Sequence, residues 1–221
     1  MLFITGTDTG VGKTVLTSLL ARHLRERGVA VAALKPICSG GRGDARALHS
    51  AFDGALTLDE INPWHFRAPL APLLAARREH RRVELANVID HVRRIQRRFD
   101  VVLVEGADGL LSALGKDLNA RDLISALRAV PIIVCPNRLG VVNHVLLTVE
   151  ALPRAMARRA PVVLMSPRRP DLASRTNPRL LAGILGSERV HEFPWLSVSW
   201  VSGQALSSIR VRHVLEVLPV G

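Results

Sequence analysis

A glycine-rich segment near the amino terminus constrains the fold more than any other part of the sequence. Gly6-Thr7-Asp8-Thr9-Gly10-Val11-Gly12-Lys13-Thr14 lies between the apolar run Leu2–Thr5 and a predicted helix over Lys13–Arg27. A glycine-rich turn between a buried strand and a helix lets backbone N–H groups surround phosphate oxygens, and the helix N-terminus adds partial positive charge. The spacing is Gly-x5-Gly-Lys-Thr, one residue longer than the common Gly-x4-Gly-Lys-Thr form. The segment therefore predicts a phosphate-binding loop, in which Lys13 reaches the β- and γ-phosphates and Thr14 holds Mg²⁺.

The rest of the chain alternates short apolar runs with helical patterns. Further strands are predicted at 29–34, 101–104, 132–134 and 162–165, and further helices at 83–98, 122–128, 143–152 and 178–185. A polar loop at 39–50 leads into a short helix, and 62–75 is interrupted by prolines. Strands that are apolar throughout and separated by helices indicate a parallel sheet with both faces covered. We therefore predict one α/β domain over 1–221, a doubly wound, mainly parallel sheet flanked by helices, with 197–221 left unassigned.

The charge of the chain is unusual, because 30 Lys and Arg residues face 19 Asp and Glu residues, giving a net charge of +11. Only Lys13, Lys35 and Lys116 are lysines, and 4% of residues are aromatic. Stacking platforms for single-stranded nucleic acid need aromatic side chains. The four arginines between 93 and 98 fall opposite the apolar stripe of their predicted helix. We interpret the charge as an arginine-rich surface and expect no nucleic-acid partner.

The cysteine count and the hydropathy pattern bear on the compartment. Two cysteines, Cys38 and Cys135, are too few for a disulfide framework, and we interpret Cys38 as a small buried residue. The first residues lack a basic leader followed by an apolar run, and no stretch of 18 apolar residues occurs. We expect a cytoplasmic location and no membrane partner.

Polar residues at the ends of predicted strands indicate a site beside the glycine-rich loop. Lys35 and Glu105 each end an apolar run, and Asp44 lies in the loop after Lys35. In open α/β sheets, ligands bind beyond the carboxyl ends of the strands. A lysine is a compact point charge, whereas an arginine is a planar fork, so a site for a transferring phosphoryl group favours lysine. Thr14, Asp44 and Glu105 offer oxygen ligands for Mg²⁺, which takes one or two carboxylates plus phosphate and water.

Taken in order, these motifs resemble the dethiobiotin synthetase family of the P-loop NTPase superfamily. The matching segments are Thr5-Gly6-Thr7-Asp8-Thr9-x-Val11-Gly12-Lys13-Thr14, Lys35-Pro36-x-x-Ser39-Gly40, Asn62-Pro63-x-x-Phe66-x-x-Pro69-x-x-Pro72, Val104-Glu105-Gly106-Ala107, Leu139-Gly140-x-x-Asn143-His144 and Glu192-Phe193-Pro194-Trp195-Leu196. The resemblance extends from residue 2 to about residue 196. It implies an ATP- and Mg²⁺-dependent ring closure of 7,8-diaminononanoate with CO2, through a carbamate and a carbamic-phosphoric anhydride, to dethiobiotin.

The resemblance also implies roles for individual residues. Lys13 and Lys35 would stabilise the γ-phosphate and carbamate charges, Thr9 and Ser39 would contact the carbamate and diamine end, and Thr14, Asp44 and Glu105 would hold Mg²⁺. Nucleotide contacts would come from Gly10, Val11, Gly12, Lys13, Thr14, Glu105, Pro194 and Leu196. Leu139, Gly140 and Asn143 would bind the far carboxylate of the substrate across a homodimer interface. Replacing Lys35 by alanine is expected to abolish turnover and to leave thermal unfolding nearly unchanged.

The sequence departs from the family pattern in three places. Asp108 stands where the family usually has glycine, and an aspartate there would repel phosphates, serve as another metal ligand or point away. Met165 or Ser166 stands where an adenine-reading asparagine is expected, so the sequence leaves the nucleotide base open. Residues 197–221 match no family segment.

Two alternatives stay open at this stage. One is a nucleotide-switch ATPase of the partition or iron-protein type, which usually carries a second lysine near the start of the loop; Thr7-Asp8-Thr9 contains none. The other is a divergent binding protein of the same fold with altered substrate or no turnover, because fold alone does not decide function.

Overall fold

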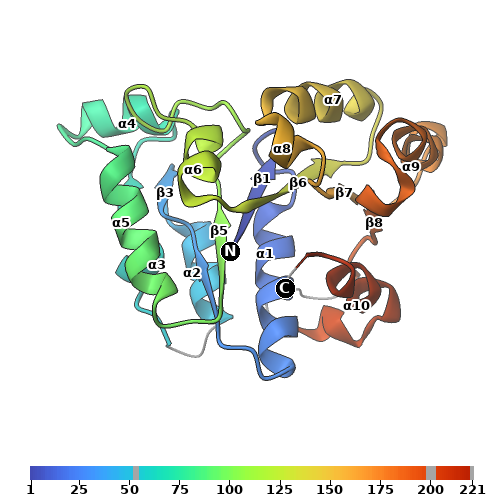
Figure 1. Ribbon diagram of the computed structural model, residues 1–221, viewed down its shortest axis with the longest axis horizontal. Coiled ribbons are helices and arrows are strands. Elements are labelled where there is room, and N and C mark those ends of the chain that lie inside the picture. The colour runs from blue at the N-terminus through green and yellow to red at the C-terminus, as the bar shows by residue number, and fades with distance from the viewer. Residues whose placement is uncertain (52–54, 198–202, 220–221) are drawn as a thin grey trace.

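A six-stranded sheet forms the centre of the molecule (Figure 1). The computed structural model describes residues 1–51, 55–197 and 203–219. The sheet order is β2-β5-β1-β6-β7-β8, and each neighbouring pair is parallel. Its strands are β1 (Leu2–Gly6), β2 (Val31–Leu34), β5 (Val101–Glu105), β6 (Val130–Pro136), β7 (Val162–Met165) and β8 (Val190–Phe193). The predicted doubly wound α/β fold is confirmed.

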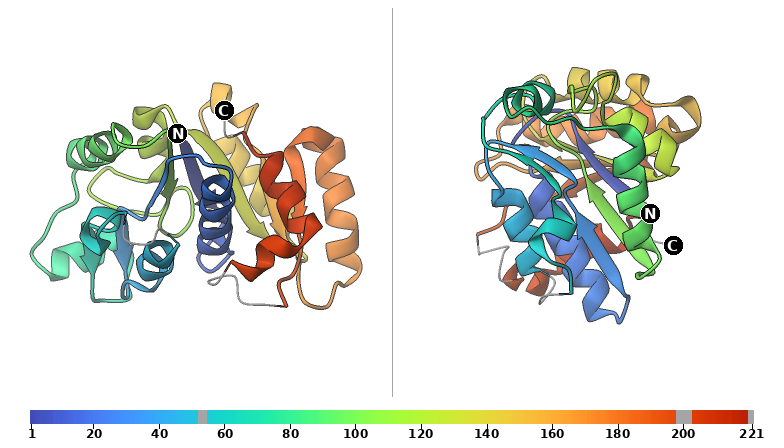
Figure 2. Two further views of the ribbon diagram at one scale, coloured as in Figure 1. Left: turned by 90° about the horizontal axis from the view of Figure 1, so that it is seen from below. Right: turned by 90° about the vertical axis from the view of Figure 1, so that its left-hand side faces the viewer.

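Helices cover both faces of this sheet (Figure 2). On one face α1 (Lys13–Glu26) packs on β1, β2 and β5, with α2 (Gly43–Ser50) and α10 (Ile209–Glu216) beside it. On the other face α5 (Leu85–Gln96) packs on β2 and β5 and contacts α6 (Ala120–Leu127), and α7 (Val141–Ala151) packs on β6. The remaining helices are α3 (Leu58–Ile61), α4 (Pro72–Arg78), α8 (Arg154–Ala157), α9 (Leu172–Leu185) and the 3₁₀ turns Ser187–Arg189 and Gln204–Ser207. No described helix is long and apolar enough to cross a membrane.

Apolar periodicity places α5 within the helix that the sequence predicts at 83–98. On this helix Val88, Val92 and Ile95 are fully buried, whereas the four arginines between 93 and 98, on its last turn and just after it, are exposed. All five residues of β1 are buried, since a strand covered on both faces has no solvent side. The segment that the sequence left unassigned contributes α10, which packs against α1 and β8; residues 198–202 and 220–221 lie outside the described part.

The order of the strands fixes where a ligand can bind. From β1 the chain crosses through α1 to β2 at one end of the sheet, and after β5 it continues through β6 toward the other end. The connections therefore diverge at β1, and a crevice opens beyond its carboxyl end. The glycine-rich loop follows β1 directly, so the fold places this loop in the crevice.

A small second sheet is a feature that the sequence did not predict. Its two parallel strands are β3 (Ile37–Ser39) and β4 (Trp64–Phe66). Each has three residues, too short to show a strand period, and β4 lies in the proline-interrupted segment. The side chain of Asn62 joins this sheet to the end of β2 by donating to the Lys35 carbonyl oxygen at 2.6 Å. The small sheet thus carries Ser39 to the same edge as the glycine-rich loop.

The start of α9 corrects the predicted helix at 178–185. The helix begins at Leu172, directly after its cap Asp171, whose side chain accepts from the Ser174 backbone N–H. Pro178 therefore lies inside the helix, where it cannot donate to the carbonyl oxygen four residues earlier. That oxygen, on Ser174, accepts instead from the Asn137 side chain at 2.7 Å. A buried tertiary hydrogen bond offsets the local cost of the proline, which sequence periodicity alone could not reveal.

We predict that Asn137→Ala lowers the free energy of unfolding by about 1–3 kcal/mol. The Asn137 side chain donates to the Ser174 carbonyl oxygen, and Asn137 Oδ1 accepts from the Asn177 side-chain amide at 3.0 Å. The substitution removes Asn137 as the partner of both of these buried groups. Urea unfolding followed by circular dichroism measures the change. The matched control Asn87→Ala removes an exposed asparagine and should stay within about 0.5 kcal/mol. Equal losses in both variants would contradict the structural role of Asn137.

Candidate active site

The glycine-rich loop is shaped by close contacts at its two ends. A Cβ atom on Gly6 would come within 2.8 Å of Val11 Cγ2, so the loop folds back over a position that only glycine can occupy. Gly12 has φ +100° and caps α1, and no described side chain caps that end of the helix. The first N–H groups of α1 are therefore available to an anion. Lys13 opens the helix, and its Nζ donates to the Asp8 carbonyl oxygen at 2.8 Å across the loop.

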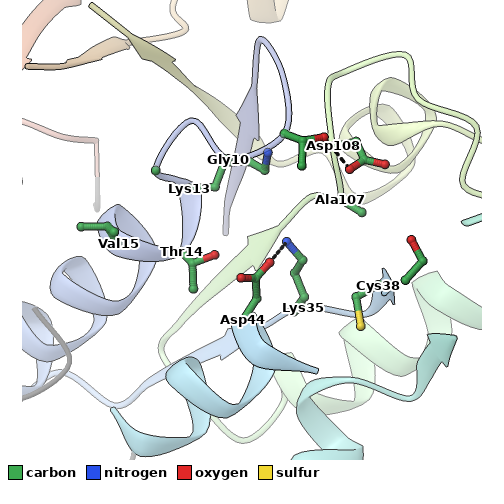
Figure 3. A pocket seen from close by; sticks show the side chains of 12 residues that line it. Gly10, Lys13, Thr14, Val15, Lys35, Cys38, Asp44, Ala107 and Asp108 are labelled. Carbon is green, nitrogen blue, oxygen red and sulfur yellow. Dashed lines mark hydrogen bonds and ion pairs between the residues drawn. The ribbon is translucent and has the colours of Figure 1, made fainter. Parts of the chain in front are cut away.

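A pocket of about 300 Å³ lies between this loop and the neighbouring strand ends (Figure 3). Its lining consists of Thr9, Gly10, Gly12, Lys13, Thr14, Val15, Lys35, Cys38, Ser39, Asp44, Ala107 and Asp108. Eight of the predicted site residues are thus brought together from the glycine-rich loop, α1, the end of β2, β3 and α2. Val11 is predicted to contact the nucleotide, but its side chain is buried beneath the loop and does not line the pocket.

A buried ion pair forms the floor of the site. Lys35 Nζ lies 2.7 Å from Glu105 Oε1 and 3.0 Å from Asp44 Oδ2. The Lys35 and Glu105 side chains are 4% and 0% exposed, whereas Asp44 is 53% exposed. Burial alone would lower the pKa of Lys35, but the charges of Glu105 and Asp44 outweigh burial and raise it above its usual value. Lys35 is therefore a permanent cation.

The oxygen atoms of Thr14, Asp44 and Glu105 fit a magnesium ion. Thr14 Oγ1 donates to Glu105 Oε1 at 2.7 Å, and Glu105 Oε2 is buried without a hydrogen-bond partner among the described residues. Despite opposing burial, the Lys35 charge keeps the pKa of Asp44 below its usual range, so this carboxylate stays ionised. No group of three His, Cys, Asp or Glu residues that could hold a metal occurs in the described ranges. Two carboxylates and a hydroxyl suit Mg²⁺, whose other ligands are phosphate and water.

The ammonium of Lys13 is less compensated than that of Lys35. Burial, and next the charge of Lys35, lower the pKa of Lys13 to about 8. Its hydrogen-bond partner is the backbone oxygen of Asp8, a dipole rather than a full charge. A triphosphate bound by the loop would supply the missing negative charge, so the loop is electrostatically poised for a polyanion.

Several predicted residues lie outside the pocket. The helix predicted at 143–152 begins earlier, at Val141 after its cap Gly140, so Asn143 lies in the first turn of α7. Leu139, Gly140 and Asn143 are exposed and do not line the pocket. Pro194 and Leu196 follow β8 at the same sheet edge and also lie outside it. The geometry of one chain leaves their predicted roles open.

Met165 and Asp108, which belong to two of the three departures from the family pattern, both lie near the loop. The Met165 side chain packs on Gly12, where a Cβ atom would come within 2.9 Å of its methyl group. Asp108 lines the pocket, and its Oδ1 accepts from Thr9 Oγ1 at 2.8 Å. Val15, Cys38 and Ala107 also line the pocket but are not among the predicted site residues. Val15 directly follows the glycine-rich segment, and Cys38 and Ala107 lie within the matching segments at 35–40 and 104–107.

Comparisons with known proteins agree with these motifs. The model of a family described as AAA domain matches residues 1–200. The ATP-dependent dethiobiotin synthetase of Anaeromyxobacter sp. (strain Fw109-5) is 42% identical over 192 residues, which cover 85% of this chain and 86% of the relative. The enzyme of the same name from Bacillus licheniformis is 37% identical over 220 residues, which cover 97% of this chain and 91% of the relative.

Solved structures resemble the chain in fold. The MinC:MinD cell division protein complex of Aquifex aeolicus matches with a TM-score of 0.62 at 15% identity, covering 100% of this chain and 97% of the other. A ParA family ATPase from Chlorobium tepidum TLS matches with a TM-score of 0.60 at 15% identity, covering 97% and 96%. At this identity the likeness concerns the fold alone.

We predict that ATP binding weakens above pH 8. Lys13 loses its charge there, while the triphosphate is already fully ionised, so the Kd should rise by up to about tenfold per pH unit. Titration calorimetry between pH 7 and 9.5 measures the change. In the matched variant Lys13→Arg the side chain stays charged, so its Kd should be nearly independent of pH. A pH-independent Kd in the unsubstituted protein would contradict a Lys13 pKa near 8.

The buried ion pair revises the expectation that Lys35→Ala leaves unfolding unchanged. We now predict that this substitution lowers the free energy of unfolding by about 3–5 kcal/mol, because it leaves the Glu105 carboxylate buried beside a cavity and without its cation. The loss should be clearly smaller when Lys35→Ala is made in a Glu105→Gln background. Urea unfolding of the four proteins of this cycle tests the coupling, and Lys116→Ala controls for loss of an exposed lysine. Equal losses in the two backgrounds would refute it.

Proposed function

The chain belongs to the dethiobiotin synthetase family, and we propose that it catalyses the ATP- and Mg²⁺-dependent closure of 7,8-diaminononanoate with CO2 to dethiobiotin. The observation that carries the proposal is that Lys13 and Lys35 line one pocket with the phosphate-binding loop. Two fixed cations in one pocket suit a reaction in which negative charge passes between a carbamate and a phosphoryl group. The named dethiobiotin synthetases that match most of the chain support the same assignment.

The residues of the pocket divide the reaction between them. CO2 forms a carbamate on one amine of the substrate, and a carbamate oxygen then attacks the γ-phosphorus of ATP, with ADP leaving. Lys35 would hold the carbamate charge, and Lys13 and the loop N–H groups would hold the charge on the phosphoryl oxygens. The second amine then attacks the carbamate carbon, the ring closes, and phosphate and a proton leave. Ser39 and Thr9, which also line the pocket, would contact the diamine.

Thr14, Asp44 and Glu105 are the residues that would hold Mg²⁺, which when bound neutralises charge on the phosphates. Support comes from the buried Glu105 Oε2, which has no partner among the described residues. The Thr14 hydroxyl already contacts the other oxygen of the same carboxylate. These side chains lie at the phosphate end of the pocket, where charge compensation is needed.

We also propose that the enzyme is a homodimer in the cytoplasm, with the substrate carboxylate bound across the interface by Leu139, Gly140 and Asn143 of the second subunit. Leu147 on α7 is 61% exposed, and Leu139, just before the helix, is 84% exposed. Asn143 lies between them in the first turn of the helix and is also exposed. Exposed leucines near these residues support a contact between subunits. Both cysteines are buried and unpaired, which supports a reducing compartment. The proposal requires neither a nucleic acid nor a membrane partner.

The nucleotide and its base are part of the proposal. Pro194 and Leu196 follow β8, whose last residue pairs with Met165 at the end of β7, so both lie at the edge where a base would extend from the loop. The Asn137 side chain cannot read a base, because it is 2% exposed and bonded to Ser174 and Asn177. We propose ATP as the phosphoryl donor on the strength of the family, with base contacts made by this apolar edge.

The direct test is phosphate release from ATP, Mg²⁺ and bicarbonate, with and without 7,8-diaminononanoate. We expect release that depends on the diamine and dethiobiotin as the product detected by mass spectrometry. Lys13→Gln should lower kcat by at least about 100-fold, because the lost cation stabilises charge that develops in the transition state.

The third lysine provides the matched control for this assay. Lys116 is exposed and lies outside the pocket, so Lys116→Gln should keep kcat within about twofold. The same assay with GTP and CTP determines how strictly the base is read. Absence of diamine-dependent turnover with every nucleotide would overturn the proposed function and favour a binding protein of the same fold.

A further inference from the structure

Asp108 has a left-handed backbone conformation at the wall of the pocket. Its φ of +53° lies in a region that glycine adopts without cost and that aspartate adopts more often than most other residues. One oxygen, Oδ1, accepts from Thr9 Oγ1 at 2.8 Å and thereby joins the loop after β5 to the glycine-rich loop. The other oxygen, Oδ2, has no hydrogen-bond or ion-pair partner in the part of the chain that the structure describes. Backbone strain of this kind at a pocket wall is a reason to look for a function.

The charge of Asp108 is unlike that of the other carboxylates in the site. Asp44 and Glu105 are each within 3.0 Å of the Lys35 ammonium, whereas Asp108 has no such ion pair among the described residues and acts on Lys13 only at longer range. Figure 3 shows Lys35 and Asp44 on one side of the pocket and Asp108 on the other. A carboxylate without a paired cation is repelled by phosphates that bind at the loop. A positive charge on the ligand would relieve that repulsion.

A metal ion does not explain this carboxylate well. The oxygens suited to Mg²⁺ gather around Thr14, whose hydroxyl contacts Glu105, while Asp108 contacts Thr9. Asp108 forms no group of three possible metal-binding residues with Asp44 and Glu105 within the described ranges. A cation on the substrate fits the free carboxylate oxygen better, and the diamine substrate of the proposed reaction carries one beside its carbamate.

We propose that Asp108 is a substrate-binding residue, whose carboxylate binds the protonated amine that has not formed the carbamate and holds it beside the carbamate carbon. This ammonium loses its proton to water before its nitrogen attacks that carbon. The proposal rests on the proposed function, because it takes the substrate to be a vicinal diamine. Two adjacent amines then meet opposite charges in one pocket: the carbamate faces Lys35, and the ammonium faces Asp108. Thr9 orients the aspartate through Oδ1 and leaves Oδ2 for the ammonium.

Asp108→Asn tests the charge with little change of shape. The amide oxygen can still accept from Thr9, but the negative charge is lost. In steady-state assays at pH 7.5, we expect the KM for 7,8-diaminononanoate to rise by about tenfold, which corresponds to about 1.4 kcal/mol. The KM for ATP and the Mg²⁺ concentration for half-maximal activity should each stay within about twofold.

Two further variants separate a role in binding from a role in folding. Asp108→Gly relieves the left-handed backbone, so its thermal unfolding temperature should not fall, while its KM for the diamine rises at least as much as in Asp108→Asn. The matched control Asp117→Asn removes an exposed aspartate of the same loop, also with φ +53°, and should leave the KM unchanged.

The outcomes distinguish this inference from the proposed function. If the unsubstituted protein shows no diamine-dependent turnover, the proposed function fails and this inference fails with it. If turnover is present but Asp108→Asn keeps the KM for the diamine, the inference alone is overturned. A shift in the Mg²⁺ requirement without a shift in that KM would make Asp108 a metal ligand and would likewise overturn it.

Discussion

The contact between Lys35 and Glu105 is the interaction on which the rest of the site depends. The two residues end β2 and β5, which are neighbours in the sheet and pair Leu34 with Val104 just before them. Parallel pairing therefore delivers an ammonium and a carboxylate to the same buried place. Burial of both charges is costly unless each compensates the other, so neither can be changed alone without loss of stability. The same pair then reaches Thr14 on α1 and Asp44 on α2, which ties the phosphate and metal side of the site to the substrate side.

The two pocket lysines act differently because their surroundings differ. Lys35 is compensated by carboxylates before any ligand arrives, so it is a fixed part of the protein's own charge pattern. Lys13 faces a backbone oxygen, and burial together with the nearby charge of Lys35 makes its own charge more costly. Bound phosphates would offset that cost, so the charge of Lys13 is compensated by the ligand and not by the protein. Carboxylates compensate the charge of Lys35 before a ligand binds, whereas bound phosphates would compensate the charge of Lys13. This difference suits a reaction in which negative charge moves between a carbamate near Lys35 and phosphoryl oxygens near Lys13.

Sequence reasoning was most successful where a feature is local. The glycine-rich loop, the buried strands and the stripe of α5 each depend on residues within one segment, and the structure confirms them. It failed at Pro178, because the hydrogen bond that makes the proline tolerable comes from Asn137, about forty residues away. The strands β3 and β4 were missed for a related reason: three residues carry no period, and their pairing is itself a long-range contact. The expectation that Lys35→Ala leaves unfolding unchanged conflicts with the buried ion pair, since a strand-end lysine gives no sign in the sequence of how deeply it is buried.

The net charge of +11 bears little relation to the site that it surrounds. The arginines of α5 lie on the surface, whereas the charged residues that line the pocket are two lysines and two aspartates, with Glu105 beneath them. A pocket with balanced charge does not attract anions indiscriminately; it distinguishes ligands by where their charges lie. Lys35 brings one compact ammonium within 3.0 Å of both Glu105 and Asp44, whereas an arginine would spread its charge over a larger planar group. The position of a single point charge, and not the total of positive charge on the chain, therefore sets the electrostatics of the site.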